Sequence, residues 1–334
     1  MLRYLARRAA LALVFVLLVS SLALLLVRVA PGDYASELFG GIGADPAQVA
    51  AARAREGLDR PLVEQYAAWL GRVLRLDFGR SLLYSRPVAE LVGQRSINTA
   101  LLALAALLVA TAVGLPLGVV SGSGGRAGRL VRGASILFLS APPLLMSLLL
   151  VFLAARTGWL PVGGMTSSAI GPGVGDWGSG IGGWIAWAGD VAWHLPVPVL
   201  ALALPVAAML ERMIAQSMAE TIEAPFIQSA RARGVPPARL VWRHALRVAL
   251  GPVASVYGLV IGTLLSGSFM VEIVTAWPGL GRLTYDALRG RDVFLVAGCA
   301  AAGALFLALG SLVSDAARAW LDPRLGDSVT GHSP

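Results

Sequence analysis

The polar segment of residues 218–248 holds the side chains of this sequence that are best suited to bind a charged partner. Pro225 suits the first turn of a helix, where its missing N–H leaves no hydrogen bond unmade, and Gly234 suits a left-handed helix end. Three arginines after the glycine recur at four-residue spacing, which places them on one helix face. They are Arg239, Arg243 and Arg247. The segment therefore predicts two short helices joined by a glycine turn, with a basic stripe on the second.

Two partners explain this basic hairpin equally well. Small residues in its first half would let another surface approach closely; they are Ser229, Ala230, Ala232 and Gly234. A helical element of this shape fits a groove on a partner protein. An ordinary basic loop that meets anionic lipid head groups accounts for the same arginines. The residue types alone leave both interpretations open.

Catalytic machinery is not apparent. A phosphate-binding P-loop needs a lysine after its glycines, and all 27 basic residues of this chain are arginine. The three histidines, His194, His244 and His332, show no metal-ligand spacing, and no Gly-x-Ser-x-Gly nucleophile motif stands out. The single Cys299 excludes an internal disulfide and, in its apolar stretch, indicates helix packing. We expect no catalytic residue, no metal site and no cofactor.

The composition is that of a membrane protein. Hydrophobic residues make up 57% of the 334 residues, the mean hydropathy is +0.73, and only 14% of residues are charged, against about a quarter in soluble domains. A bilayer core about 30 Å thick needs roughly 20 apolar residues of helix. Six stretches reach that length: about 9–29, 97–121, 133–155, 195–217, 249–271 and 293–314. The sequence therefore predicts an all-α, polytopic protein with six transmembrane helices.

The first stretch is predicted to be a retained helix, because its apolar run exceeds the 7–15 residues typical of a signal peptide and no clear cleavage site follows. Arginine placement then gives the orientation. With the N-terminus in the cytoplasm, the whole formal charge of +8 falls on the cytoplasmic side, as the positive-inside rule requires. Both termini are then cytoplasmic.

Four regions follow from this topology. Residues 1–30 form the first transmembrane helix, and residues 31–96, which include amphipathic pieces, form an extracytoplasmic helical cap. Residues 97–318 form the main transmembrane domain, with the cytoplasmic loop at about 218–248, and residues 319–334 form a cytoplasmic tail. The outer loop 157–194 is rich in glycine and tryptophan, which indicates anchoring at the membrane surface or contact with a docking partner.

No source of energy for transport is visible. The chain lacks a P-loop lysine, and its apolar stretches are nearly free of the ionisable groups through which secondary carriers move protons or ions. Energy must therefore come from another protein, unless the chain is a passive pore.

Motifs spread over residues 1–325 carry a family resemblance. The sequence has Gln228-Ser229-Ala230-Arg231-Ala232-Arg233-Gly234 followed by His244-Ala245-Leu246-Arg247. It also has Pro31-Gly32-Asp33, Gly57-Leu58-Asp59-Arg60-Pro61, Asp77-Phe78-Gly79-Arg80-Ser81-Leu82, Gly114-Leu115-Pro116-Leu117-Gly118, Trp277-Pro278-Gly279-Leu280-Gly281-Arg282 and Arg291-Asp292. In these residues the chain resembles the ABC transporter permeases of the dipeptide/oligopeptide/nickel importer family.

The resemblance implies a type I ABC importer permease fold in a prokaryotic inner membrane. It implies that the cytoplasmic loop docks on an ATPase through Gln228, Ser229, Ala230, Arg231, Arg233, Gly234, His244 and Leu246. Trp277, Pro278, Gly279, Gly281 and Arg282 would form a motif at the outer mouth, where a rigid turn is the simpler interpretation. The implied partners are a second permease subunit, two cytoplasmic ATPase subunits that hydrolyse ATP, an extracytoplasmic binding protein and the lipid bilayer, with no nucleic acid.

The sequence is compatible with three functions. The main one is the permease of an ATP-driven importer for a peptide-like solute, with nickel or another small solute as the alternative cargo. The second is a secondary carrier or passive channel, and the third is a scaffold that recruits a cytoplasmic protein without transport. Flux in vesicles and its dependence on the ATPase distinguish the three.

Overall fold

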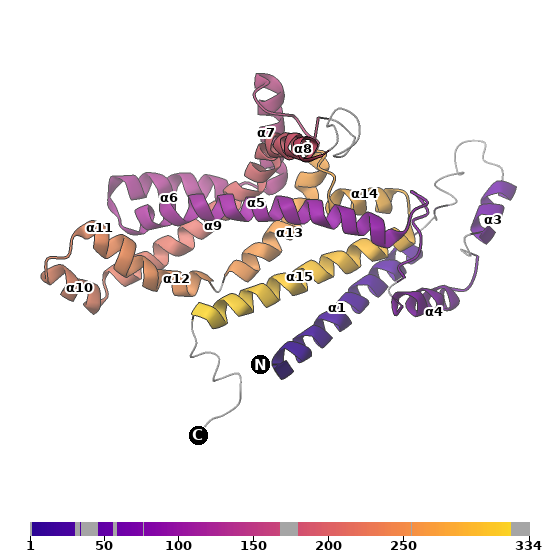
Figure 1. Ribbon diagram of the computed structural model, residues 1–334, viewed down its shortest axis with the longest axis horizontal. Helices are drawn as coiled ribbons and strands as arrows, with labels where there is room; N and C mark the ends of the chain where they lie inside the picture. Colours follow the sequence, from indigo (N-terminus) through magenta and orange to yellow (C-terminus); the bar gives the residue numbers. More distant parts are fainter. Residues whose placement is uncertain are drawn as a thin grey trace. The chain divides into compact units, whose positions relative to one another are not determined.

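The computed structural model describes residues 2–30, 34, 46–55, 59–75, 77–167, 180–254 and 256–321 (Figure 1). Every regular element within these ranges is a helix, and the extended contact there is a single bridge between Arg80 and Pro87. The predicted all-α class is confirmed.

The helices follow one another along the chain in two groups of similar size. The first group is α1 (Leu2–Val29), α3 (Pro46–Arg55), α4 (Leu62–Val73), α5 (Val88–Gly122), α6 (Gly125–Ser140), α7 (Pro143–Thr157) and α8 (Ile181–His194). The second is α9 (Pro196–Ile222), α10 (Pro225–Ala232), α11 (Pro237–Arg239), a π-helical segment (Leu240–Ala245), α12 (Leu246–Ala254), α13 (Tyr257–Val274), α14 (Leu280–Arg289) and α15 (Val293–Leu321).

Four of the described helices are long and apolar enough to cross a membrane: Arg7–Val29 of α1, α5, α9 and Val293–Leu312 of α15. The bent pair of α6 and α7 makes a fifth candidate if it counts as one span. Helix α13 contributes a shorter apolar stretch, Val260–Val274. The chain is thus a polytopic helical protein, while the count of six spans stays a prediction.

The apolar stretch 133–155 does not form the single helix that its hydropathy predicts. Helix α6 ends at Ser140, Ala141 and Pro142 are extended, and α7 begins at Pro143, with an angle of 101° between the two helices. Two consecutive prolines explain the break, since each disfavours the helical conformation of the residue before it and lacks a donor. The stretch 249–271 is likewise divided, because α12 ends at Ala254 and α13 starts at Tyr257.

The chain divides into two compact units. Unit 1 comprises residues 1–99 and 278–308, and unit 2 comprises residues 100–277 and 309–334. In unit 1, Trp69 of α4 is almost fully buried in a cluster with Leu24 of α1 and Val293 of α15. The Tyr66 hydroxyl, one turn before it, donates a hydrogen bond to Ser21 Oγ of α1 at 3.1 Å. The amphipathic helix α4 is therefore packed onto α1.

Helix α9 is the centre of unit 2. It packs against α6, α7, α8, α12 and α13, and two-thirds of its most apolar window is buried. Its buried residues fill the largest apolar cluster of the chain, with Leu210, Ile214 and Met218 essentially inaccessible to solvent. A helix that is apolar on nearly all sides is expected at the core of a bundle rather than at its surface.

Helix α5 approaches α9 through a row of glycines at four-residue spacing. A Cβ atom on Gly114 would lie 2.7 Å from the carbonyl oxygen of Ala207, and one on Gly122 would lie 2.6 Å from that of Ala215. On Gly118 it would lie 2.6 Å from Cβ of Ile214. Small residues at this spacing let two membrane helices meet at backbone distance, where dispersion contacts are dense.

We predict that Gly118→Ala lowers the free energy of unfolding by about 1–3 kcal/mol, the usual cost of overpacking, because neither backbone can retreat without losing the contact. Thermal unfolding of the purified chain in detergent measures this. Gly133→Ala in α6 is the matched control, since nothing lies within 4 Å of its added methyl group. Alanine is also favoured over glycine there by about 1 kcal/mol. Equal melting temperatures for the two variants would contradict close α5–α9 packing.

Candidate functional site

Within the polar segment 218–248, residues 224–247 form a helical hairpin that extends from the end of α9. Ala224 is extended and Pro225 occupies the first position of α10, as its chemistry favours. Gly234 has φ +80°, a left-handed conformation that ends α10, and its N–H donates to the carbonyl of Arg231 at 3.0 Å. The expected sequence of helix, glycine turn and helix is present.

The second half of this hairpin differs from a regular helix. After the single turn of α11, residues Leu240–Ala245 are π-helical, and the N–H of Leu246 donates to the carbonyl of Val241, five residues back. Such segments are rare and often occur at functional sites. The basic stripe is therefore shared by α11, the π-helical segment and α12 rather than carried by one helix.

One face of the hairpin is anchored in unit 2. Ile227 of α10 and Ala245 belong to the same buried cluster as Ile214 and Met218 of α9. Ser217 of α9 donates a hydrogen bond to the carbonyl oxygen of Ala249 in α12 at 2.9 Å. The hairpin and the core helix α9 are therefore packed as one body.

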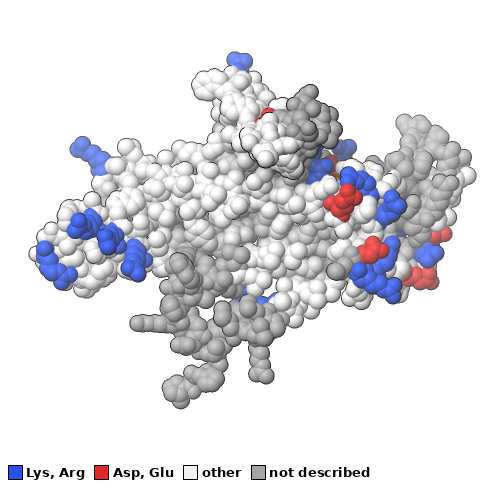
Figure 2. Space-filling model, in the orientation of Figure 1, with Lys and Arg blue, Asp and Glu red and all other residues white. Residues whose placement is uncertain are grey.

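The other face is exposed and basic. Of the predicted docking residues, Gln228, Ser229, Arg231, Arg233, Gly234 and His244 are exposed, Leu246 is half-buried and Ala230 is buried. Arg239, Arg243 and Arg247 are also exposed, and within the described ranges none of the hairpin arginines pairs with a carboxylate. Figure 2 shows the row of basic side chains at this end of unit 2, with no acidic side chain on that face. The structure thus places six of the eight predicted residues where a partner can reach them.

The predicted outer-mouth motif is a buried turn. Trp277 is inaccessible to solvent in the core of unit 2. In unit 1, the carbonyl oxygen of Pro278 accepts a hydrogen bond from the Asn98 amide at 2.8 Å, and the N–H of Leu280 donates to Thr99 Oγ1 at 2.7 Å. Gly279 precedes α14, Gly281 is buried in it, and the Arg282 side chain is half-buried. These contacts agree with the simpler interpretation, a rigid turn.

Two motifs far apart in sequence meet in unit 1. Asp292 is fully buried. Its Oδ2 accepts hydrogen bonds from Ser81 Oγ at 2.6 Å and from the N–H of Leu83 at 3.0 Å. Its Oδ1 accepts a hydrogen bond from the N–H of Leu295 at 3.0 Å. The last contact caps α15. In the same loop, burial first and the carboxylate of Asp286 second raise the pKa of Tyr84 above its usual value.

A contact between Ser167, Asp190 and His194 in unit 2 is not a catalytic triad. The Ser167 hydroxyl donates to Asp190 Oδ1 at 2.8 Å instead of facing the imidazole, and His194 Nδ1 lies 2.8 Å from the backbone carbonyl of Asp190. Because the hydroxyl donates its hydrogen bond to the carboxylate rather than to the histidine, these three residues lack the Ser–His contact of a Ser-His-Asp triad. Among the described residues, no group of three or more His, Cys, Asp or Glu is placed to hold a metal ion.

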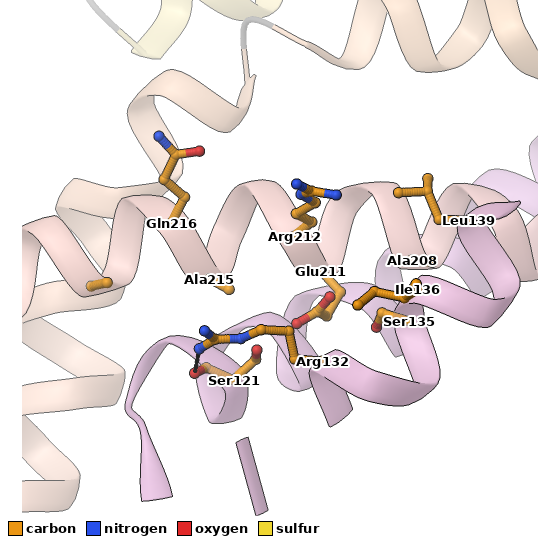
Figure 3. A pocket seen from close by; sticks show the side chains of 11 residues that line it. Ser121, Arg132, Ser135, Ile136, Leu139, Ala208, Glu211, Arg212, Ala215 and Gln216 are labelled. Carbon is orange, nitrogen blue, oxygen red and sulfur yellow. Dashed lines mark hydrogen bonds between the residues drawn. The ribbon is translucent and has the colours of Figure 1, made fainter. Parts of the chain in front are cut away.

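One polar site was missed by the sequence analysis. A pocket of about 320 Å³ lies between the end of α5, α6 and α9, lined by Ser121, Arg132, Ser135, Glu211 and Arg212 among others (Figure 3). Glu211 is 1% exposed and its Oε1 has no hydrogen-bond partner, as is also true of Ser121 Oγ. Arg132 donates instead to the carbonyl oxygen of Ser121, at 3.2 Å. The available signal was a charged residue inside an apolar stretch, which marks a functional candidate.

The comparisons with known proteins agree with this architecture. Residues 114–327 match the model of the binding-protein-dependent transport system inner membrane component family, and residues 1–92 match the model of the N-terminal region of such membrane components. The chain belongs to this family. The matched regions include the glycine row of α5, the pocket, the basic hairpin and the Trp277 turn.

Curated relatives of this permease family match over nearly the whole chain. The oligopeptide transport system permease protein AppB of Bacillus subtilis (strain 168) is 30% identical over 330 residues, covering 96% of this chain and 98% of that protein. A protein of Sinorhizobium fredii described as a probable peptide ABC transporter permease is 31% identical over 325 residues, covering 96% and 98%. A candidate peptide transport system permease of Brucella abortus (strain 2308) is 34% identical over 325 residues, covering 96% and 97%.

For the permease, we predict that Asp292→Ala lowers the free energy of unfolding by roughly 2–4 kcal/mol, because it leaves buried donors of the 81–83 loop unpaired and removes a helix cap. Thermal unfolding in detergent checks this. Asp59→Ala makes the same change at an exposed position and should leave the melting temperature within about 1 °C. A melting temperature for Asp292→Ala as high as that of the Asp59 variant would exclude this role.

Proposed function

We propose that this chain is one of two permease subunits of an ATP-driven ABC importer that carries a peptide handed over by an external binding protein. The single observation that carries the proposal is the basic hairpin, a rigid element with one face anchored in the helix core and the other exposed and unpaired. The family membership supports a transport role at the inner membrane, and the names of the relatives support a peptide as cargo.

ATP hydrolysis belongs to separate subunits in this proposal. The chain has no lysine with which to build a P-loop. Two ATPase subunits would each receive one permease hairpin in a surface groove, with Arg231 and Arg233 facing acidic side chains of the groove. Gln228, Ser229, Gly234 and His244 are exposed on the same hairpin, and Ala230 and Leu246 hold its packed side.

Movement of the hairpin would be transmitted through α9. Because Ile227 and Ala245 share the buried cluster of Ile214 and Met218, the hairpin cannot shift far without α9. Close-packed interiors transmit displacement as rigid-body motion rather than by local deformation. Alternating access then follows if α9 and its counterpart in a second permease line the pathway. A heterodimer is the arrangement that we favour.

The proposal places both termini and the hairpin in the cytoplasm, and places the loop that follows α7 and the 275–282 turn outside. The exposed arginines of the hairpin and the positive-inside rule support this orientation. A binding protein would dock at the outer side. Nickel or another small solute remains the alternative cargo, and a passive channel is the alternative of another class.

We predict that Gly234→Pro abolishes co-purification of the ATPase while the permease still inserts in the membrane. Proline is fixed near φ −65° and cannot adopt the +80° of the turn, so the two hairpin halves would separate. Gly234→Asn is the matched control, because asparagine tolerates the left-handed conformation, and it should keep the ATPase bound. Normal ATPase recovery with the proline variant would refute docking through this hairpin.

We predict the sides of the membrane from cysteine labelling. In a Cys299→Ala background, Val162→Cys in the loop after α7 should react with a membrane-impermeant maleimide added to intact cells. Arg239→Cys in the hairpin should react only after the membrane is permeabilised. Both positions are exposed, so access to the reagent depends on the side and not on burial. Labelling with the opposite pattern would reverse the orientation.

A further inference from the structure

The pocket between α5, α6 and α9 combines a buried acid with exposed bases, an arrangement that the transport proposal does not use. Glu211 projects from α9 on the side where Arg132 and Ser135 of α6 lie (Figure 3). Its carboxylate forms no ion pair with any described residue, although Arg132 lines the same pocket. A buried carboxyl oxygen without a hydrogen-bond partner is costly, so a donor from outside this chain would stabilise the site.

We propose that this pocket binds the head group of a phospholipid that carries a primary ammonium, namely phosphatidylethanolamine. The ammonium donates hydrogen bonds to the Glu211 carboxylate. The phosphate accepts hydrogen bonds from the guanidinium of Arg132, which holds only a 3.2 Å contact with a backbone carbonyl in this structure. The pocket volume of about 320 Å³ is sufficient for such a head group.

The position of the pocket fits a lipid rather than a solute in transit. Ser121 is the penultimate residue of α5, so the pocket lies at the end of a membrane span, at the level of lipid head groups. Ile136 and Leu139 of α6 line the pocket and are 55% and 40% exposed, which gives acyl chains an apolar surface next to the site. Basic pockets between helices at this level bind phospholipid head groups.

The hydrogen-bonding requirement sets the lipid class. A choline head group has the same charge as ethanolamine but no N–H, so it cannot donate to Glu211. Phosphatidylglycerol offers the phosphate to Arg132 but brings no cation to Glu211. The site therefore predicts a preference for ethanolamine over choline and glycerol head groups, with Glu211 responsible for the preference and Arg132 for the phosphate.

The test measures lipid retention by the purified, delipidated full-length chain. The chain is incubated with equimolar dioleoyl phosphatidylethanolamine and dioleoyl phosphatidylcholine, and bound lipid is counted by native mass spectrometry. We expect about tenfold preferential retention of the ethanolamine lipid, as for a charged hydrogen bond in a partly buried site. The N-monomethyl and N,N-dimethyl ethanolamine lipids should fall in order between the two. Equal retention across this series would overturn the proposal without any mutation.

Variants assign the preference to Glu211. Glu211→Gln keeps the shape of the side chain and should remove the ethanolamine preference, whereas Arg132→Gln should weaken retention of both lipids. Glu220→Gln is the matched control on α9, since Glu220 is exposed and its contact is a hydrogen bond from Gln216 at 3.3 Å that glutamine can still accept. An unchanged preference in Glu211→Gln, as would follow if Arg132 swings over to neutralise the carboxylate, would refute the site. The outcome does not depend on ATPase docking, so it stands apart from the transport proposal.

Discussion

The close approach of α5 to α9 is the constraint on which unit 2 depends. Gly114, Gly118 and Gly122 allow the two backbones to meet where a single added carbon would be only 2.6–2.7 Å from its nearest neighbour. This contact fixes α9 as the centre of the bundle, and the other helices of the unit pack around it. In a membrane no hydrophobic force draws helices together, so fit at backbone distance takes over that role. The buried row of leucine, isoleucine and methionine side chains along α9 follows from it.

The basic hairpin and the Glu211 pocket both involve this same helix. The basic hairpin continues from its C-terminal end and shares its buried cluster, so a partner that pulls on the hairpin acts on the core of the unit. The Glu211 pocket opens beside its C-terminal half, next to the end of α5. If the proposed coupling role of the hairpin and the proposed lipid site both hold, the surrounding membrane would influence how readily α9 moves. The arrangement gives a physical reason for a transport protein to place a charged residue where burial is costly.

The sequence predicted the local features well and the distant ones poorly. Pro225 and Gly234 act through their own backbone preferences, so the hairpin turn could be located to the residue. The break at Pro142 and Pro143 followed the same rules but was hidden, because a hydropathy window averages over two helices. The pairing of Ser81 with Asp292 spans 211 positions, and no periodicity reports such a contact. The environment of Glu211 depends on Ser121 and Arg132 from two other helices, so its burial could not be read from α9 alone. The π-helical segment likewise has no signature in residue types.

We propose that this chain forms the transport pathway and transmits the movement of the basic hairpin, while separate subunits supply the energy from ATP. Transport into proteoliposomes tests this most directly. The vesicles contain ATP inside, and a peptide mixture and the cognate binding protein are added outside. The peptides that accumulate inside are identified by mass spectrometry. Vesicles that hold both permeases and the ATPase subunits should concentrate peptide above the outside level, and vesicles that hold this chain alone should not. Uphill accumulation by the chain alone would contradict the account.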